Sequence, residues 1–134
     1  MTLMKPLLFT AAFLLFSLSL FGQTSDIRNF RHGKFRVPSD TDGDYVIIRK
    51  GNRQIEFMEK IGVQAVFIVN WKSDSIYTLR PAKNSVRLFP RFPKNALITV
   101  RILQVKEHSY IQLTSSNFDE YKYTSEIFKV EDYR

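Results

Sequence analysis

Apolar and polar residues alternate with a period of two along most of the chain after residue 30. Val, Ile, Phe and Tyr fill these alternating runs, which is typical of β-strands. Clusters rich in Gly, Pro, Ser, Asn and Asp separate the runs and predict turns. The pattern predicts strands at residues 30–37, 45–49, 54–60, 64–71, 75–79, 96–105, 109–114 and 121–130. The last segment also fits a short helix, but the alternation of Tyr121 and Tyr123 favours a strand.

The phase of the alternation also predicts which side chains face the core. Strand 64–71 is apolar on both faces, so we expect it in the middle of a sheet. Near the C-terminus we expect Ile111 and Leu113 to face inward. Segment 80–95 contains three prolines and therefore predicts a loop, with a short edge piece at residues 86–89.

About eight strands joined by short turns in ~105 residues form a meander that must bury its apolar faces. An all-β domain of this kind closes into a small antiparallel barrel or folds as a flattened β-sandwich. Closure also removes unpaired strand edges, which invite aggregation in a chain so rich in strand-forming residues. We therefore expect an antiparallel meander closed into a barrel, with the sandwich as the alternative.

The first 23 residues have the composition of a secretory signal peptide. Lys5 supplies a positive charge, and an uncharged run of 15 residues ends at Phe21. The alternative is an uncleaved membrane anchor, but a membrane-spanning helix needs about 20 apolar residues. We expect a signal-peptide helix at residues 1–22, cleaved after Gly22 or, as the alternative, after Gln23. Cleavage would leave an exported protein, periplasmic or extracellular, with no stable membrane span.

Residues 23–134 then form a single domain, large enough for one core without covalent staples. The chain has no cysteine, which excludes disulfides, thiol catalysis and zinc–thiolate or iron–sulfur sites. Its net charge is +7; segment 80–106 holds seven basic residues and no acid, whereas segment 107–134 is acidic. This asymmetry suggests an anionic partner, and the alternative is that exposed basic side chains simply keep the domain soluble.

No motif in the chain has the spacing of a known catalytic or metal-binding arrangement. Residues 40–44 contain three aspartates, but the glycine stands fourth where an EF-hand loop requires it sixth, so a turn is the simpler interpretation. His32 and His108, the only histidines, have no third ligand at a clear spacing. Glu56 and Glu59 would point to opposite faces of a strand and so do not form an acid–base pair. We expect no enzymatic activity, no metal site and no cofactor.

Basic and aromatic side chains are interleaved in the proline-rich loop, at Arg87, Phe89, Arg91 and Phe92. Such a pairing can bind single-stranded nucleic acid, but export of the chain argues against a nucleic-acid partner. An anionic component of the cell envelope is the alternative partner, and a loop that only caps a barrel mouth would have the same composition. The candidate anion-binding residues are Arg87, Arg91, Lys94 and Arg101.

The barrel interior is the other candidate site. An eight-stranded barrel either fills with side chains or holds one small ligand. Five large side chains are candidates to fill it or to line a ligand cavity: Phe35, Phe57, Phe67, Trp71 and Tyr77. In a domain of ~105 residues a filled core is the default expectation, and a cavity for a small apolar ligand is the alternative.

Several short motifs occur in the order found in one family, at residues 30–35 (FRHGKF), 48–49 (IR), 53–56 (RQIE) and 71–79 (WKSDSIYTL). With these motifs the chain resembles a group of small exported, lipocalin-like β-barrel proteins of Bacteroidetes-type bacteria. The resemblance implies a lipocalin-like barrel, and Gly33-Lys34-Phe35 is similar to the G-x-W opening of lipocalins. Members of this group are often named DNA topoisomerase IV automatically, but a small exported chain without a nucleotide-binding motif does not fit that activity.

Two hypotheses for the function follow. In the first, the chain is a non-enzymatic exported barrel that binds a small apolar or amphipathic molecule or serves the cell envelope structurally. In the second, the chain is an interaction module whose segment 80–106 docks on an anionic envelope surface or polysaccharide.

The docking hypothesis predicts binding to anionic liposomes or heparin that weakens steeply from low to high salt. The reason is that salt screens charge–charge attraction beyond about 10 Å at 0.1 M ionic strength. Co-sedimentation with liposomes and elution from heparin measure the effect. Retention that ignores salt would contradict docking through this segment.

Overall fold

The computed structural model describes residues 26–39, 43–58, 60, 62–83, 85 and 92–133. The expected signal peptide at residues 1–22 and the expected edge piece at 86–89 lie outside the described residues. In the part of the chain that is described, no helix has the length and apolar character needed to cross a membrane.

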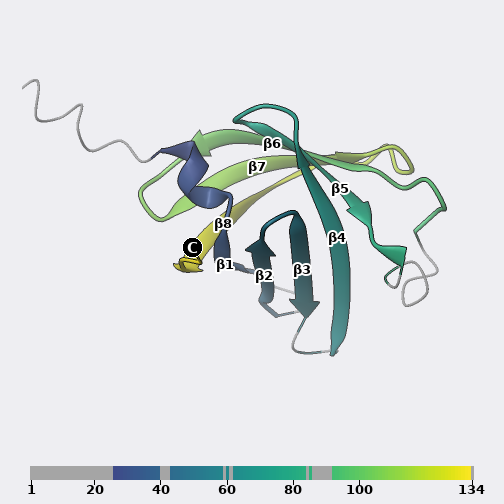
Figure 1. The fold of residues 1–134 in the computed structure, drawn as a ribbon, viewed down its shortest axis with the longest axis horizontal. Coiled ribbons are helices and arrows are strands. Elements are labelled where there is room, and N and C mark those ends of the chain that lie inside the picture. The colour runs from purple at the N-terminus through teal and green to yellow at the C-terminus, as the bar shows by residue number, and fades with distance from the viewer. Residues whose placement is uncertain are drawn as a thin grey trace, which may run out of the picture.

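Eight antiparallel strands close into a barrel, which confirms the expected all-β meander (Figure 1). The strands are β1 (Gly33–Val37), β2 (Tyr45–Lys50), β3 (Arg53–Met58), β4 (Val63–Trp71), β5 (Ile76–Pro81), β6 (Ile98–Val105), β7 (Ser109–Ser116) and β8 (Tyr123–Glu131). Each strand pairs with its neighbours in sequence, and β1 pairs with β8 to complete the cylinder. The C-terminal segment, for which the sequence also allows a helix, is strand β8.

The N-terminal end of the domain differs from the expected first strand. Ile27–Phe30 form a short 3-10 helix, η1, which Asp26 caps by accepting a hydrogen bond from the backbone N–H of Arg28 at 2.9 Å. Strand β1 begins only at Gly33, where φ is +137° and a Cβ atom would lie 2.6 Å from the carbonyl oxygen of Glu131. Only glycine fits this conformation and this close approach of β1 to β8. Figure 1 shows η1 at one end of the barrel, just before the chain enters β1.

A buried arginine closes the end of the barrel that η1 covers. Arg49 on β2 has no exposed surface. Its guanidinium donates to four acceptors: the Phe30 carbonyl oxygen, Gln54 Oε1 at 2.9 Å, and the Tyr77 and Tyr110 hydroxyls at 3.0 Å each. These acceptors belong to η1, β3, β5 and β7, so one side chain joins four elements besides its own strand. A buried charge is tolerated only when its hydrogen bonds are satisfied, and here the partners satisfy them.

Aromatic rings pack around this arginine. The Phe30 ring lies edge-on to the Tyr110 ring with centroids 5.2 Å apart, and the Phe35 ring lies 6.2 Å from Tyr110 in a similar geometry. The Arg49 guanidinium lies 4.9 Å from the centroid of the Phe35 ring. Edge-to-face pairs and cation–π contacts of this kind each contribute about 0.5–1.5 kcal/mol beyond the burial of apolar area. The end next to η1 is therefore a filled aromatic core.

Strand β3 turns polar residues inward, and Phe57 is on the outer face. Gln54, Glu56 and Met58 line the barrel interior, so Phe57 between them points the other way and is half-buried on the outside. The expectation that Phe57 faces the interior is wrong. The pairing in the β2–β3 hairpin explains this, because Ile47 is buried in the core and its partner on β3 is Glu56.

Strand β7 also buries the face opposite to the one that the sequence predicts to be buried. Gln112 and Thr114 are buried, and Ile111 and Leu113 lie on the outer face. The pairing of β6 with β7 explains this, because Thr114 and Gln112 lie opposite the buried Val100 and Ile102, and Leu113 lies opposite the exposed Arg101. The register shift at Leu103 lies beyond these pairs, in β6. The expectation that Ile111 and Leu113 face inward is therefore wrong.

We predict that Arg49→Gln lowers the free energy of unfolding by about 3–5 kcal/mol, because it leaves several buried hydrogen-bonding groups without partners. Urea denaturation followed by circular dichroism measures the loss. Arg101→Gln, an exposed position on β6, is the matched control and should change stability by about 0.5 kcal/mol or less. If the free energy of unfolding of Arg49→Gln lies within about 1 kcal/mol of that of the unchanged protein, the arginine does not stabilise this end of the barrel.

Candidate functional site

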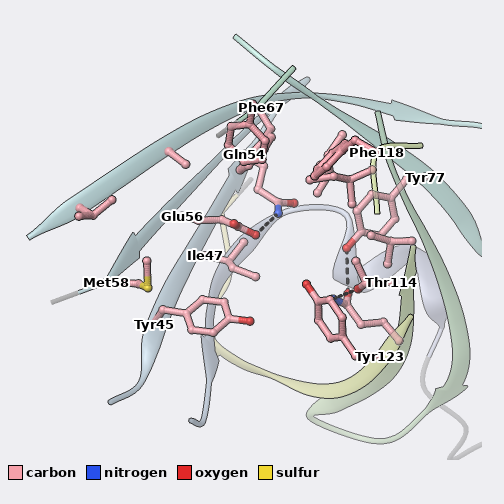
Figure 2. Close-up of a pocket in the computed structure, with 17 residues that line it drawn as sticks. Tyr45, Ile47, Gln54, Glu56, Met58, Phe67, Tyr77, Thr114, Phe118 and Tyr123 are labelled. Atoms are coloured by element: carbon pink, nitrogen blue, oxygen red, sulfur yellow. Dashed lines mark hydrogen bonds between the residues drawn. The ribbon is translucent and has the colours of Figure 1, made fainter. Parts of the chain in front are cut away.

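The barrel is hollow at the end opposite η1. A cavity of about 480 Å³ occupies that half of the interior (Figure 2). This volume falls within the range of about 300–1,000 Å³ that small-molecule sites occupy. Its lining consists of Tyr45, Ile47, Gln54, Glu56, Met58, Val63, Ala65, Phe67, Tyr77, Leu79, Phe92, Ile98, Val100, Gln112, Thr114, Phe118 and Tyr123. The default expectation of a filled core therefore holds only at the η1 end.

The five side chains proposed from the sequence to fill or line the interior lie in four different places. Phe67 and Tyr77 line the cavity. Phe35 is completely buried at the η1 end, next to Arg49. Trp71 is also outside the lining: it is half-buried beside Tyr77, with ring centroids 4.6 Å apart, and lies under the Arg31 guanidinium. Phe57 lies on the outer face of β3.

A continuous chain of hydrogen bonds runs down one wall of the cavity, across its floor and up the opposite wall. On the β3 side, Gln54 Nε2 donates to Glu56 Oε1 at 3.1 Å, and Gln54 Oε1 accepts from Arg49 at 2.9 Å. On the floor, Arg49 donates to the Tyr77 hydroxyl at 3.0 Å. On the β7 side, Tyr77 donates to Gln112 Oε1 at 3.1 Å, and Gln112 Nε2 donates to Thr114 Oγ1 at 3.3 Å. The polar groups are thereby held in fixed orientations.

Glu56 is the acidic end of this chain, and its carboxylate points into the cavity from β3 (Figure 2). Burial raises the pKa of the Glu56 carboxyl, and this effect outweighs the hydrogen bond from Gln54 and the positive charge of Arg49, which both lower it. Burial also raises the pKa of the Tyr45 and Tyr123 hydroxyls, which point toward the same space. Both tyrosines are therefore neutral hydrogen-bonding groups near neutral pH.

Aromatic side chains extend from the cavity to the rim of the barrel. The Phe92 ring lies 5.8 Å from Phe67 inside and 5.9 Å from Phe118, both edge-to-face. Tyr121 and Tyr123 stack 6.0 Å apart, and Phe118, Tyr121 and Tyr123 are all exposed. A hollow of about 290 Å³ at the rim shares part of the lining of the cavity. The site is thus open to solvent at this end, and its apolar surface continues to the edge.

Two of the four candidate anion-binding residues, Lys94 and Arg101, lie in the described part of the structure. Lys94 lies in the turn before β6, and Arg101 lies on the outer face of that strand; both are exposed. Arg87 and Arg91 lie outside the described residues. Neither Lys94 nor Arg101 lines the cavity.

Within the described ranges, no group of three or more His, Asp or Glu side chains is placed to hold a metal ion. His32 and His108 are exposed. Of the aspartates in segment 40–44, Asp40 and Asp42 lie outside the described residues, and Asp44 pairs with Arg36 at 2.8 Å.

The polar residues that define the cavity, Gln54, Glu56 and Gln112, are absent from the sequence-based candidates. The hairpin turn at residues 51–52 predicts the inward position of two of them, Gln54 and Glu56. A two-residue turn pairs Arg49 with Gln54 and Ile47 with Glu56, so placing Ile47 in the core places Glu56 there too. Gln112 follows in the same way from β6, because it lies opposite Ile102, which shares the inward face of that strand with Val100.

Comparisons of the chain with protein-family models, with curated proteins and with solved structures find no match. The site is therefore interpreted from its own geometry.

We predict that Glu56→Gln raises the free energy of unfolding at pH 7 by about 1 kcal/mol, the low end of the cost of desolvating a buried polar group. The pKa of Glu56 is higher in the folded than in the unfolded state, so the folded state favours the protonated form. The penalty for the ionised form is complete at pH values above the folded-state pKa and vanishes below 4.5, the ordinary pKa of a glutamate side chain. The stability difference should therefore disappear as the pH falls to about 4.

Urea denaturation at both pH values measures this difference. Glu120→Gln, an exposed position, is the control and should show no such dependence on pH. A Glu56→Gln variant that is less stable than the unchanged protein at pH 7 would contradict the assigned pKa direction.

Proposed function

We propose that this chain is an exported, non-enzymatic, lipocalin-like barrel that carries a small amphipathic molecule in its interior. The observation that carries the proposal is the cavity of about 480 Å³, closed at the η1 end and open at the rim. A small-molecule site usually combines an apolar wall with a few fixed polar groups, and both are present here.

The apolar part of the lining suits the body of such a ligand. Phe67, Leu79, Val100 and Ile98 offer aromatic and branched aliphatic surface without polar atoms. The aromatic rings at the rim extend this surface, which favours a ligand whose body reaches from the cavity toward solvent. Burial of apolar ligand surface contributes about 25 cal/mol per Å², so such contacts supply most of the affinity.

The polar part of the lining suits the head of the ligand. Gln112 and Thr114 on one wall and Glu56 on the other are already oriented by the chain of hydrogen bonds, so they lose little freedom on binding. Export is supported by residues 1–22, which have the sequence of a signal peptide. The chain would therefore meet its ligand outside the cytoplasm.

We predict that the purified protein, expressed as the full chain, binds the neutral apolar dye N-phenyl-1-naphthylamine with an increase in dye fluorescence. Ala65→Phe should weaken this binding at least about tenfold, which corresponds to 1.4 kcal/mol, because Ala65 is buried in the cavity wall. Gln64→Phe adds the same ring at the adjacent exposed position of β4 and should leave binding unchanged.

Circular dichroism checks that both variants fold. If the unchanged protein does not bind the dye, or if both variants bind it equally well, the cavity is not a ligand site and a purely structural role is favoured.

A further inference from the structure

The charge inside the cavity has the opposite sign to the charge of the whole chain. The chain carries a net charge of +7. Among the described residues that line the cavity there is no Lys, Arg or His, and Glu56 is the one acidic side chain. Among these described lining residues, a ligand in the cavity therefore meets one formal charge, and that charge is negative.

Arg49, a cation just below the described part of the cavity, is not free to bind a ligand. Arg49 is completely buried beneath the cavity floor, and its N–H groups are directed to Phe30, Gln54, Tyr77 and Tyr110. Gln54 stands between Arg49 and Glu56, so no direct ion pair neutralises the carboxylate.

The Glu56 carboxylate has hydrogen-bonding capacity left for a ligand. In the described part of the chain, it accepts one hydrogen bond, from Gln54 to Oε1 at 3.1 Å. A carboxylate has about four lone-pair sites, so Oε2 and the remaining sites of Oε1 are open to a donor in the cavity. The hydroxyls of Tyr45 and Tyr123 face the same space from β2 and β8 (Figure 2).

The rest of the lining favours a cation over an anion. The rings of Phe67, Phe92 and Phe118 line the cavity, and the faces of aromatic rings attract cations. An ammonium group would neutralise the partly buried Glu56, whereas a ligand carboxylate would add a second negative charge in a poorly hydrated space. Fatty acids and other anionic amphiphiles are disfavoured for the same reason.

We propose that the ligand of this cavity is a small apolar amine whose protonated nitrogen binds the Glu56 carboxylate and whose apolar body packs against the aromatic wall around Phe67. This inference rests on the proposed carrier function and names the chemical class of the ligand. Glu56 is the residue that determines specificity, and the apolar wall supplies affinity without discrimination.

Three probes with one carbon skeleton test the inference, namely 1-naphthylmethylamine, 1-naphthalenemethanol and 1-naphthoic acid. Isothermal titration calorimetry at pH 7.5 and low salt gives a Kd for each. The amine should bind at least about tenfold more tightly than the alcohol, and the acid should bind most weakly. Glu56→Gln should remove the preference for the amine, with the Kd of the alcohol changed by less than about threefold.

Glu120→Gln is the matched control for general electrostatic attraction, because Glu120 is an exposed acidic residue that lines neither the cavity nor the rim hollow. This variant should keep the preference for the amine. If the amine, alcohol and acid bind the unchanged protein equally well, or if Glu120→Gln removes the preference and Glu56→Gln does not, the inference is wrong and the carrier function stands. If none of the three probes binds, nor the neutral dye, both the carrier function and the inference fail.

Discussion

The hydrogen bonds of one buried guanidinium determine the rest of this structure. Arg49 joins β2 to η1, β3, β5 and β7, elements that are far apart in the sequence. A cation in this position cannot be left partly bonded, because the cost of a buried unpaired charge is several kcal/mol. The four acceptors must therefore converge on it, and this convergence closes one end of the barrel. Phe30 reaches its place only because the chain forms η1 before β1, and Gly33 allows the close approach of β1 to β8.

The closed end permits the other half of the barrel to remain hollow. The chain has no cysteine, so its barrel relies on packing for stability, and net stabilities of such domains are only about 5–15 kcal/mol. Here the aromatic contacts of Phe30, Phe35 and Tyr110 and the bonds of Arg49 are concentrated at the η1 end. The open end keeps a cavity of about 480 Å³ lined by polar as well as apolar groups. Neither a cavity nor a buried carboxylate contributes to stability, so their presence is more consistent with binding than with a purely structural barrel.

The sequence predicts the positions of the strands well, but it assigns the wrong inward face to β3 and β7. The reason is the same for these two strands. Alternation gives the period of a strand but not which of its two faces is inside. In β3 the apolar Ile55 and Phe57 suggest one answer, while pairing with β2 imposes the other by placing Glu56 opposite Ile47. In β7 the apolar Ile111 and Leu113 suggest one answer, while pairing with β6 imposes the other by placing Gln112 opposite the buried Ile102. A rule that puts apolar residues inside fails where polar side chains line the interior, so it finds Phe67 and Tyr77 and misses Glu56 and Gln112, which only the strand pairing places there.

The charge inside the cavity and the net charge of the chain differ in sign. The positive net charge and the basic segment 80–106 point toward an anionic partner when the chain is considered as a whole. Net charge, however, describes the exposed surface, whereas a ligand inside a barrel interacts with the few groups that line it. Among the described residues that line the cavity, those groups are one carboxylate, several hydroxyls and amides, and aromatic rings, while Arg49 is fully bonded beneath the floor. Electrostatic interactions strengthen as water is excluded, so the charge of Glu56 acts more strongly on a group inside the cavity than a hydrated surface charge does. Under the proposed carrier function, the described lining therefore favours a ligand with the opposite charge to the partner that the surface would attract.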